Sequence, residues 1–327
     1  MKKILHFTSG LDSGGAEKIL IDIATKDILN KHFIISFKDF GIYEGIIKKN
    51  NIKVKCFNIS KLNLIFKLPM ILVHAYKIKP NIVITWMYHA DLIGGLVAKL
   101  LFIKKVYWNI RNSTFDTSKT KWLTLFFLKV CSKLSYFVPD KIISCSEKAI
   151  QLHIEAGYKD VFYLIPNGVD IEEFKNLNLE KKNDTIYLGY AGRWHPQKNY
   201  EFFFECLSEL KNKFNYCKFK VLMAGNFINE NNSVLVNLIK KNDLTENILL
   251  LGEIEEMVKF YNSIDINILT SSYGEAFPNV IAESMSCETP CLSTEIGDVK
   301  NIMGDLGWII KQNDKKKFVN LIRIGGA

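Results

Sequence analysis

Short runs of β-branched, aromatic and aliphatic residues alternate with helical patterns along the whole sequence. The first series of strand-like runs reads KILHFTS, HFIISF, IKVKCFNI, NIVITW, KVYWNI, KIISCS and VFYLIP. A second series reads TIYLGYAG, FKVLMAG, NILLLGE, INILTSS and PCLSTE. Strands that alternate with helices are typical of βαβ units in a parallel sheet. Because the alternation restarts, and because 327 residues exceed the size at which one core keeps growing, the sequence predicts two Rossmann-like, doubly wound α/β domains.

A polar segment separates the two series. Residues 166–184 read PNGVDIEEFKNLNLEKKND, with a turn signal at Asn167-Gly168 and no long apolar run. We therefore expect an N-terminal domain over residues 1–168, an interdomain linker over residues 169–184 and a C-terminal domain over residues 185–327. The two domains are expected to face each other across a cleft, with ligands outside the carboxyl ends of the strands.

Positive charge is concentrated in the first half of the chain. Up to Ile165 there are 25 Lys and Arg against 12 Asp and Glu, whereas the remainder has 18 against 22. The basic half favours an anionic partner, and by charge alone nucleic acid, an anionic membrane surface and a phosphorylated lipid all fit. Within it, Lys61–Lys79 and Lys119–Phe137 mix lysines, aromatics and long aliphatics at helical spacing, as interfacial helices do. Core helices with lysines at their exposed edges are the alternative.

Cysteine usage and the N-terminus favour a cytoplasmic protein. The seven cysteines form no CxxC pair, which is typical of reduced thiols. The apolar run in MKKILHFTSG is too short for the core of a signal peptide. No stretch approaches the length of a membrane-spanning helix without an interrupting charge or proline.

The stretch Thr270–Thr294, TSSYGEAFPNVIAESMSCETPCLST, holds the most informative pattern. A strand ends there in a loop that contains Glu275, and a helical pattern follows from Asn279. The free N–H groups and the positive dipole end of such a helix favour an anion such as a phosphate. Glu283 lies on the first turns of this helix, and we expect neither Glu275 nor Glu283 to be buried in a core.

Other strand ends carry charged or ring side chains. Arg193 follows a strand and Lys198 precedes a helix in YAGRWHPQKNYEFFFE, so together they could neutralise a diphosphate. His89 is expected on the loop before a helix over Asp91–Leu101, and Arg111 offers a cation for a phosphate beyond the strand KVYWNI. Taken alone, His89 could be structural, Arg111 could form a surface ion pair and the Arg193–Lys198 loop could be merely solvated.

Glycines after the first strand permit a tight turn and a close approach to a ligand. The segment reads TSGLDSGGAEK, with Gly14 and Gly15 at the expected helix start. It is not G-x-G-x-x-G, so the dinucleotide fingerprint is absent.

The Glu-x7-Glu spacing around Phe277-Pro278-Asn279 resembles the signature of the retaining nucleotide-sugar glycosyltransferases of family 4, which have the GT-B fold. The resemblance extends to the GGAE loop, the Trp-Met-Tyr-His-Ala-Asp segment and the Gly-Arg…Lys motif at Gly192, Arg193 and Lys198. It implies that the first Glu meets hydroxyls of the donor sugar and the second holds the ribose. Backbone amides between them hold the diphosphate.

The resemblance also assigns residues to roles. The donor-binding residues that it implies are Gly15, Gly192, Arg193, Lys198, Ile254, Glu275, Ala276, Phe277, Pro278, Asn279, Val280 and Glu283. The acceptor-binding residues are Gly14, Gly15, His89 and Arg111, and the catalytic ones are Glu275, His89, Arg193 and Lys198. Front-face attack, in which the donor phosphate takes the acceptor proton, is implied as well, without a protein nucleophile, a cofactor or a metal.

The sequence departs from that family in three places. Ser286–Pro290 replaces the usual Ala-Cys-Gly-x-Pro, and the Gly-rich segment that often follows is reduced to Glu295-Ile296-Gly297-Asp298. The sequence also ends at Ala327 without the long C-terminal helix that crosses back to the first domain, which puts domain closure in doubt.

These observations predict a retaining hexosyl or N-acetylhexosaminyl transferase. It would move a sugar from a nucleotide diphosphate, expected to be a UDP-sugar, to a glycan or polyprenyl-diphosphate-linked acceptor of lipopolysaccharide, capsule or another envelope glycoconjugate. We expect it at the inner face of the cytoplasmic membrane, on an anionic surface, and not on nucleic acid. The alternatives are a non-hydrolysing nucleotide-sugar epimerase of the same fold, an NAD-dependent Rossmann enzyme and a non-catalytic partner subunit. The epimerase should lack the Glu-x7-Glu pattern, and the dehydrogenase should have the dinucleotide glycines.

Overall fold

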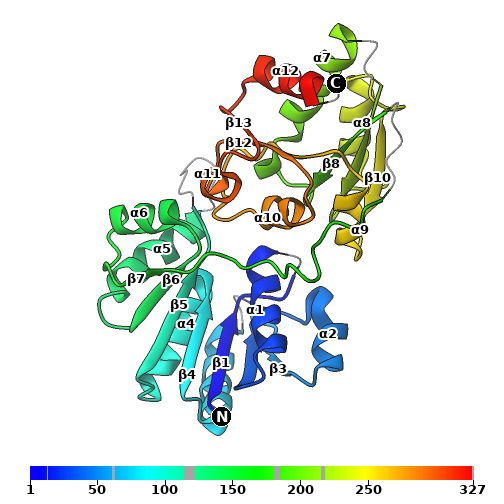
Figure 1. The fold of residues 1–327 in the computed structure, drawn as a ribbon. Helices are drawn as coiled ribbons and strands as arrows, with labels where there is room; N and C mark the ends of the chain where they lie inside the picture. Colours follow the sequence, from blue (N-terminus) through cyan, green and yellow to red (C-terminus); the bar gives the residue numbers. More distant parts are fainter. Residues whose placement is uncertain (13, 61–62, 114–121, 180–184, 215–217, 326–327) are drawn as a thin grey trace. The chain divides into compact units, whose positions relative to one another are not determined.

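The chain folds into two compact α/β units, residues 1–167 and residues 168–327. A computed structural model describes residues 1–12, 14–60, 63–113, 122–179, 185–214 and 218–325. Each unit has one parallel sheet with helices on both faces (Figure 1). The predicted fold class is confirmed.

The sheet of the first unit has the order β3-β2-β1-β4-β5-β6-β7. Its strands are β1 (Lys3–Thr8), β2 (Lys31–Ser36), β3 (Lys53–Cys56), β4 (Ile82–Trp86), β5 (Lys105–Ile110), β6 (Lys141–Ser144) and β7 (Phe162–Leu164). Its helices are α1 (Gly15–Lys26), η1 (Gly41–Tyr43), α2 (Glu44–Lys49), α3 (Leu64–Ile78), α4 (Met87–Leu100), α5 (Trp122–Leu134) and α6 (Glu147–Glu155). The strand order reverses between β1 and β4, which is where such sheets bind ligands.

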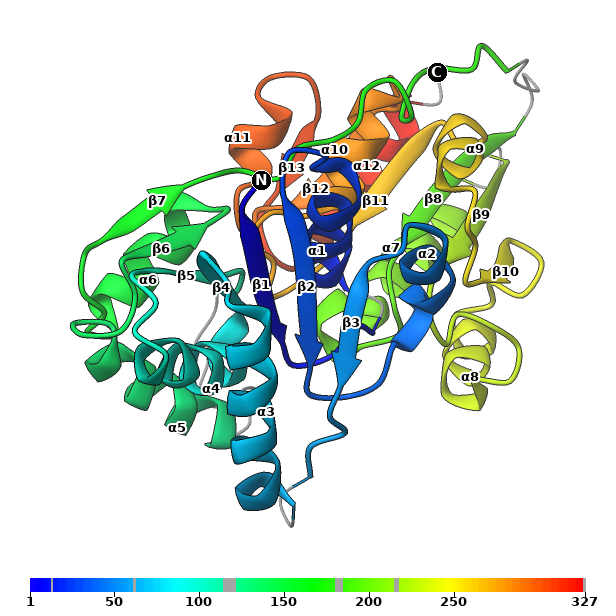
Figure 2. The ribbon, with the colours of Figure 1, turned by 90° about the horizontal axis from the view of Figure 1, so that it is seen from below.

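Two apolar clusters cover the two faces of this sheet. One cluster joins α1 and α2 to the sheet through residues such as Leu20, Ile47 and Ile34. The other joins α3, α4 and α5 to the opposite face through residues such as Ala75 and Leu128. Figure 2 shows α3, α4 and α5 side by side on that face.

The sheet of the second unit has the order β10-β9-β8-β11-β12-β13. Its strands are β8 (Ile186–Ala191), β9 (Phe219–Ala224), β10 (Ile248–Gly252), β11 (Ile266–Leu269), β12 (Cys291–Thr294) and β13 (Trp308–Ile310). Its helices are η2 (Pro196–Lys198), α7 (Tyr200–Lys213), α8 (Ser233–Lys241), α9 (Met257–Asn262), α10 (Asn279–Ser286), α11 (Val299–Met303) and α12 (Lys315–Gly325). Here the order reverses between β8 and β11.

The two faces of the second sheet are again covered by separate apolar clusters. Aromatic residues of α7, among them Phe203 and Phe204, pack with α8 and α12 on one face. On the other face, smaller clusters hold α9, α10 and α11. The sequence did not predict β13, whose three residues are too short a run for a strand pattern.

The polar segment expected to be a linker is packed against the second unit over its described residues. Phe174 is 5% exposed and lies in the cluster around Tyr261. Asn262 accepts a hydrogen bond from the Leu177 N–H at 2.7 Å, and Ser286 Oγ donates to the Phe174 carbonyl at 2.6 Å. Residues 168–179 therefore form a strap on this unit, and residues 180–184 lie outside the described part.

Both segments expected to be interfacial are helical where they are described. Helix α3 begins at Leu64 and α5 at Trp122, while residues 61–62 and 119–121 lie outside the described part. Among the described residues, no helix combines the length and the apolar character needed to cross a bilayer. The six described cysteines are free thiols.

Gly94 shows how closely α4 approaches the sheet. A Cβ at this position would lie 2.6 Å from Cγ of Phe7, a fully buried side chain of β1. Gly45 on α2 differs, because a Cβ there would meet no atom within 4 Å.

We expect Gly94→Ala to lower the free energy of unfolding by about 1–3 kcal/mol, since the added methyl group overpacks the core. Gly45→Ala is the matched control and should leave stability unchanged or raise it by up to about 1 kcal/mol, because alanine is the better helix former. Urea unfolding followed by far-UV circular dichroism measures both. Equal effects of the two substitutions would contradict this packing.

Candidate functional site

The second unit brings two charged loops together at the carboxyl ends of β8 and β11. The two strands are neighbours in the sheet. The first loop follows β8 and carries Arg193 and Lys198, and the second follows β11 and carries Glu275. Because parallel strands end at the same edge of a sheet, the loops meet at the point where the strand order reverses.

Lys198 and Glu275 form a largely buried ion pair between these loops. Lys198 Nζ lies 2.7 Å from Glu275 Oε1, and the two side chains are 11% and 13% exposed. Ser271 Oγ donates a hydrogen bond to the same carboxylate oxygen at 2.8 Å. Burial by itself raises the pKa of Glu275, but the charge and hydrogen bond of Lys198, with smaller contributions from Ser271 and Arg193, hold that pKa below its ordinary value. The carboxyl group is therefore ionised at neutral pH.

Two glycines allow the backbone to pack at this edge. Gly225 after β9 has a φ of +144°, and a Cβ there would lie 2.3 Å from the carbonyl oxygen of Gly192. Gly297 has a φ of +52°, and a Cβ there would lie 2.4 Å from the carbonyl oxygen of Glu275. The reduced Gly-rich segment thus retains the one glycine that lets residues 295–298 rest on the loop of Glu275.

The helix start after this loop has the predicted form. Helix α10 begins at Asn279, and its N-cap residue is Pro278, which has no side-chain acceptor. Pro278 precedes it, Ala276 is buried, and Phe277, Asn279 and Val280 are half-buried. The N-terminus of α10 thus places the positive end of a helix dipole beside the loop of Glu275, which favours an anion.

Glu283 is buried, which corrects the expectation that neither carboxylate would be. It is 6% exposed, and Tyr261 of α9 donates its hydroxyl hydrogen to Glu283 Oε2 at 2.9 Å. The hydrogen bond fixes the carboxylate on the inner side of α10. The spacing of residues in the sequence indicates on which side of α10 Glu283 lies. It does not indicate that α9 packs over that side.

Ile254 lies on the loop that follows β10. Its half-buried side chain packs in the cluster that contains Ala191 and Ala224, the last residues of β8 and β9. It is thus near the same edge of the sheet as Arg193, on the side away from β11.

In the first unit the candidate residues lie at the carboxyl ends of β1, β4 and β5. Gly14 precedes α1 in an extended conformation, and Gly15 is its first residue. A Cβ on Gly14 would lie 2.3 Å from a carboxylate oxygen of Glu17, so the glycine admits that side chain.

His89 lies inside a helix, not on the loop where it was expected. The helix α4 begins at Met87, directly after β4, and Met87 takes a left-handed φ of 69°. This strained residue makes the turn without any loop, which puts His89 on the first helical turn. The His89 ring is half-buried at 4.3 Å from the ring centre of Phe127, and burial lowers its pKa.

Arg111 lies against neutral groups. Its guanidinium donates to the side-chain oxygens of Asn109 and Asn167 and is stacked 5.3 Å from the Trp86 ring centre. None of its contacts within the described part of the chain is to a carboxylate. The surface ion pair considered as the alternative is thus absent from the described part of the chain.

Trp86 is held in turn by a buried chain of imidazoles. Its indole N–H donates to His6 Nδ1 at 3.2 Å, and His6 Nε2 lies 2.8 Å from His32 Nδ1. Since an indole only donates, His6 must carry its hydrogen on Nε2, and His32 then donates from Nε2 to Asp27 at 3.1 Å. Burial lowers the pKa of His6 to about 3, so its ring stays neutral.

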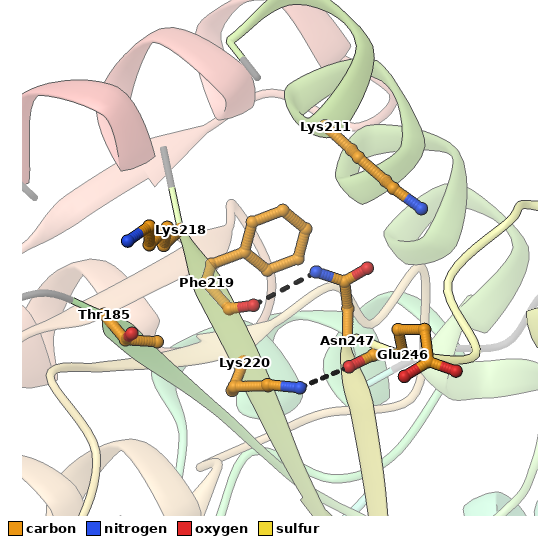
Figure 3. A pocket seen from close by; sticks show the side chains of 7 residues that line it. All are labelled: Thr185, Lys211, Lys218, Phe219, Lys220, Glu246 and Asn247. Atoms are coloured by element: carbon orange, nitrogen blue, oxygen red, sulfur yellow. Dashed lines mark hydrogen bonds between the residues drawn. The ribbon is translucent and has the colours of Figure 1, made fainter. Parts of the chain in front are cut away.

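A cavity lies elsewhere in the second unit. It has a volume of about 400 Å³ and is lined by Thr185, Lys211, Lys218, Phe219, Lys220, Glu246 and Asn247 (Figure 3). These residues stand at the amino ends of β9 and β10, opposite to the edge that carries Arg193 and Glu275. Lys211 and Lys220 are bound there to backbone carbonyls, so the cavity is separate from the candidate site.

Sequence motifs alone did not identify several residues that support the site. They are Tyr190, Ser271, Thr270, Tyr261, Gly225 and Gly297. A serine and a threonine at a strand end gave a weak signal, whereas the tyrosines gave none. Among the described residues, no group of three His, Cys, Asp or Glu side chains could hold a metal ion.

Comparison with known proteins gives one family and several relatives. The profile of the family described as "Glycosyl transferases group 1" matches residues 170–324. The chain is 26% identical over 294 residues to the UDP-Gal:alpha-D-GlcNAc-diphosphoundecaprenol alpha-1,3-galactosyltransferase of Escherichia coli, covering 82% of this chain and 72% of that protein. It is 23% identical to the putative glycosyltransferase EpsF of Bacillus subtilis, covering 90% of this chain and 79% of that protein.

A similar solved structure is that of Anabaena Alr3699/HepE in complex with UDP-glucose. It superposes with a TM-score of 0.84 at 19% identity, covering 99% of this chain and 89% of that one. At this identity the likeness shows the fold, which is GT-B.

The ion pair of Glu275 makes stability depend on pH in a defined direction. Its folded pKa lies below that of an unfolded glutamate, about 4.3. The stabilisation is therefore complete above that value and is lost as pH falls through the folded pKa. Between about pH 5 and pH 2, the wild type should lose more unfolding free energy than Glu275→Gln, as measured by urea unfolding at each pH. Parallel curves for the two proteins would contradict the ion pair.

Proposed function

We propose that this protein transfers a sugar from a UDP-sugar to a glycan or lipid-linked acceptor with retention at the anomeric carbon, because residues 170–324 match the family described as "Glycosyl transferases group 1". The observation that carries the proposal is the Lys198–Glu275 pair, with Arg193 beside it, at the strand ends where β8 meets β11. Two cations and a helix N-terminus suit a diphosphate, and a carboxylate next to them suits sugar hydroxyls.

Each donor-binding residue has a separate role in this proposal. Arg193, Lys198 and the start of α10 take up the negative charge that develops on the departing diphosphate. Glu275 binds hydroxyls of the donor sugar, and Glu283 on α10 binds the ribose. The backbone from Ala276 to Val280 lies against the diphosphate, and Ile254 lies near the base.

The proposed reaction proceeds on one face of the sugar. The bond between the anomeric carbon and the diphosphate oxygen breaks, and the acceptor hydroxyl forms its new bond from the same face. The diphosphate oxygen that leaves takes the hydroxyl proton, so the products are the glycoside and UDP. No metal is needed in this scheme, because the charge of the leaving group is met by Arg193, Lys198 and the helix start.

Kinetics with the donor varied test these roles. Glu275→Gln should chiefly lower kcat, by about 10²-fold, because it loses contacts that strengthen as the sugar leaves. Glu283→Gln should chiefly raise the donor KM, since the ribose is held alike before and during the reaction. The assay is the release of UDP from UDP-sugars in the presence of EDTA, with and without acceptor.

A control and four outcomes complete that test. Glu295→Gln, an exposed carboxylate on the neighbouring loop, should keep wild-type kinetics. Exchanged effects would mean exchanged roles for Glu275 and Glu283, and no effect of either would place the site elsewhere. Activity lost in EDTA and restored by a divalent ion would contradict the metal-free scheme. UDP-sugar epimerisation instead of transfer would replace the proposal by the epimerase alternative.

We further propose that the first unit receives an anionic acceptor. The E. coli relative acts, by its name, on a diphosphoundecaprenol-linked sugar. Here the first half of the chain is strongly basic, and Arg111 makes no described contact with a carboxylate. Arg111 would bind the acceptor phosphates, while His89 and Gly14-Gly15 line the adjoining strand ends. An envelope polysaccharide or glycoconjugate would be the product.

The helices α3 and α5 are proposed to bind the anionic inner face of the cytoplasmic membrane. Each buries one face in the core and exposes large apolar side chains on another. On α3 these are Ile65, Phe66, Met70, Val73 and Tyr76, and on α5 they are Trp122 and Phe126. Exposed lysines stand beside them, among them Lys77 and Lys129. Apolar side chains flanked by lysines suit the headgroup region of an anionic bilayer.

Vesicle sedimentation tests the membrane proposal. The protein should bind vesicles of phosphatidylglycerol and phosphatidylcholine, and more weakly as salt rises, because part of the attraction is electrostatic. Phe66→Gln should weaken binding about threefold or more, as expected for apolar area lost from the bilayer. Leu29→Gln, an equally exposed apolar residue after α1, is the control and should bind as the wild type does. Binding that is independent of anionic lipid at low salt would contradict the proposal.

A further inference from the structure

The loop that carries Arg193 and Lys198 is fastened at both ends by tyrosine hydroxyls. Tyr200 donates to the Gly192 carbonyl at 2.7 Å, and Tyr190 donates to the Lys198 carbonyl at 2.6 Å. Both tyrosines are buried, with 4% and 0% of their surface exposed. The hydroxyl hydrogens are therefore committed to the backbone of this loop.

Thr270 reaches the same carbonyl from the other loop. Its Oγ1 donates to the Lys198 carbonyl at 2.9 Å and lies 3.1 Å from the Tyr190 hydroxyl oxygen. A carbonyl oxygen has two lone pairs and can accept both bonds. Thr270 is fully buried and directly follows β11. The Lys198 backbone is thus bound both to Tyr190 of β8, the strand that precedes its loop, and to Thr270 at the end of the neighbouring strand β11.

This arrangement links the backbone of Lys198 to the position of its side chain. Thr270 donates a hydrogen bond to the carbonyl of Lys198. In the same loop as Thr270, the Glu275 carboxylate binds Lys198 Nζ and is itself fixed by a hydrogen bond from Ser271. If the carbonyl moved, the ammonium group would no longer meet the carboxylate at 2.7 Å without a change of rotamer.

We propose that Tyr190 and Thr270 are positioning residues for Lys198, which hold its ammonium group where the diphosphate leaves; this rests on the proposed function. Neither hydroxyl contacts substrate in this scheme. Each acts through the backbone of Lys198, and because both bind one carbonyl, either can partly replace the other.

Conservative substitutions separate the two hydroxyls. Tyr190→Phe and Thr270→Val should each lower kcat by about threefold, since one hydrogen bond to the carbonyl remains. The double variant should lower kcat by about 10²-fold, more than the product of the single effects, because the loop is then free to misplace Lys198. The donor KM should stay within about twofold in all three. Tyr158→Phe is the control, a buried tyrosine whose hydroxyl has no partner within the described residues, and it should keep the wild-type kcat.

A second comparison distinguishes positioning from a general effect on the fold. In a Lys198→Ala background, adding Tyr190→Phe should change kcat by less than about twofold, because the residue that it positions is gone. If Tyr190→Phe lowered kcat as much in that background as in the wild type, the hydroxyl would act by another route. That result would overturn the proposal.

A measurement without substrate tests the positioning independently of the proposed function. Lys198 is paired and shielded, so an amine-directed reagent should label it slowly in the wild type and faster in the double variant, as read by mass spectrometry. Lys211 of α7, which forms an ion pair with Asp243 at 2.8 Å, is the internal control, and its labelling rate should not change. Unchanged labelling of Lys198 would overturn the proposal. Faster labelling in a protein that transfers no sugar would uphold the positioning and reject the proposed function.

Discussion

The ion pair between Lys198 and Glu275 is the contact on which the candidate donor site depends. Taking two charges out of water costs several kcal/mol for each ion, and the attraction offsets this cost only in a well-fixed geometry. The second unit supplies that geometry because β11 runs beside β8, so the loops at their ends are neighbours. Ser271 and Arg193 add further stabilisation of the carboxylate. Neither loop could keep its charge buried without the other.

Both units use the same strand order but distribute charge differently at the edge where that order reverses. In the second unit this edge carries the Lys198–Glu275 ion pair, with Arg193 on the same loop as Lys198. In the first unit it carries Trp86, held by a chain of neutral imidazoles, with the Arg111 guanidinium against its ring. A cation surrounded by amides and an indole keeps its attraction for an anion.

Patterns in the sequence predicted the strands, the strand-to-helix loops and the charged residues on them, because these depend on local periodicity and on turn residues. They failed where tertiary packing decides. His89 was expected on a loop, but the left-handed conformation of Met87 starts α4 two residues before it. Glu283 was expected outside a core, but α9 covers it and supplies Tyr261 as its partner. The polar composition of the segment after residue 168 gave no sign that Phe174 packs in the second unit.

Three supports of the site, Tyr190, Thr270 and Gly297, share one property that explains why they could not be predicted. Tyr190 on β8 and Thr270 directly after β11 bind one carbonyl. Gly297 leaves room for the backbone of the Glu275 loop, which lies one helix and one strand earlier in the chain. Each contact is made to a main-chain oxygen, which every residue has, so no residue type marks the partner. A motif identifies the side chains that meet a ligand, since chemistry restricts their type. The residues that hold such side chains in place are restricted only by distance, and distance becomes known with the fold.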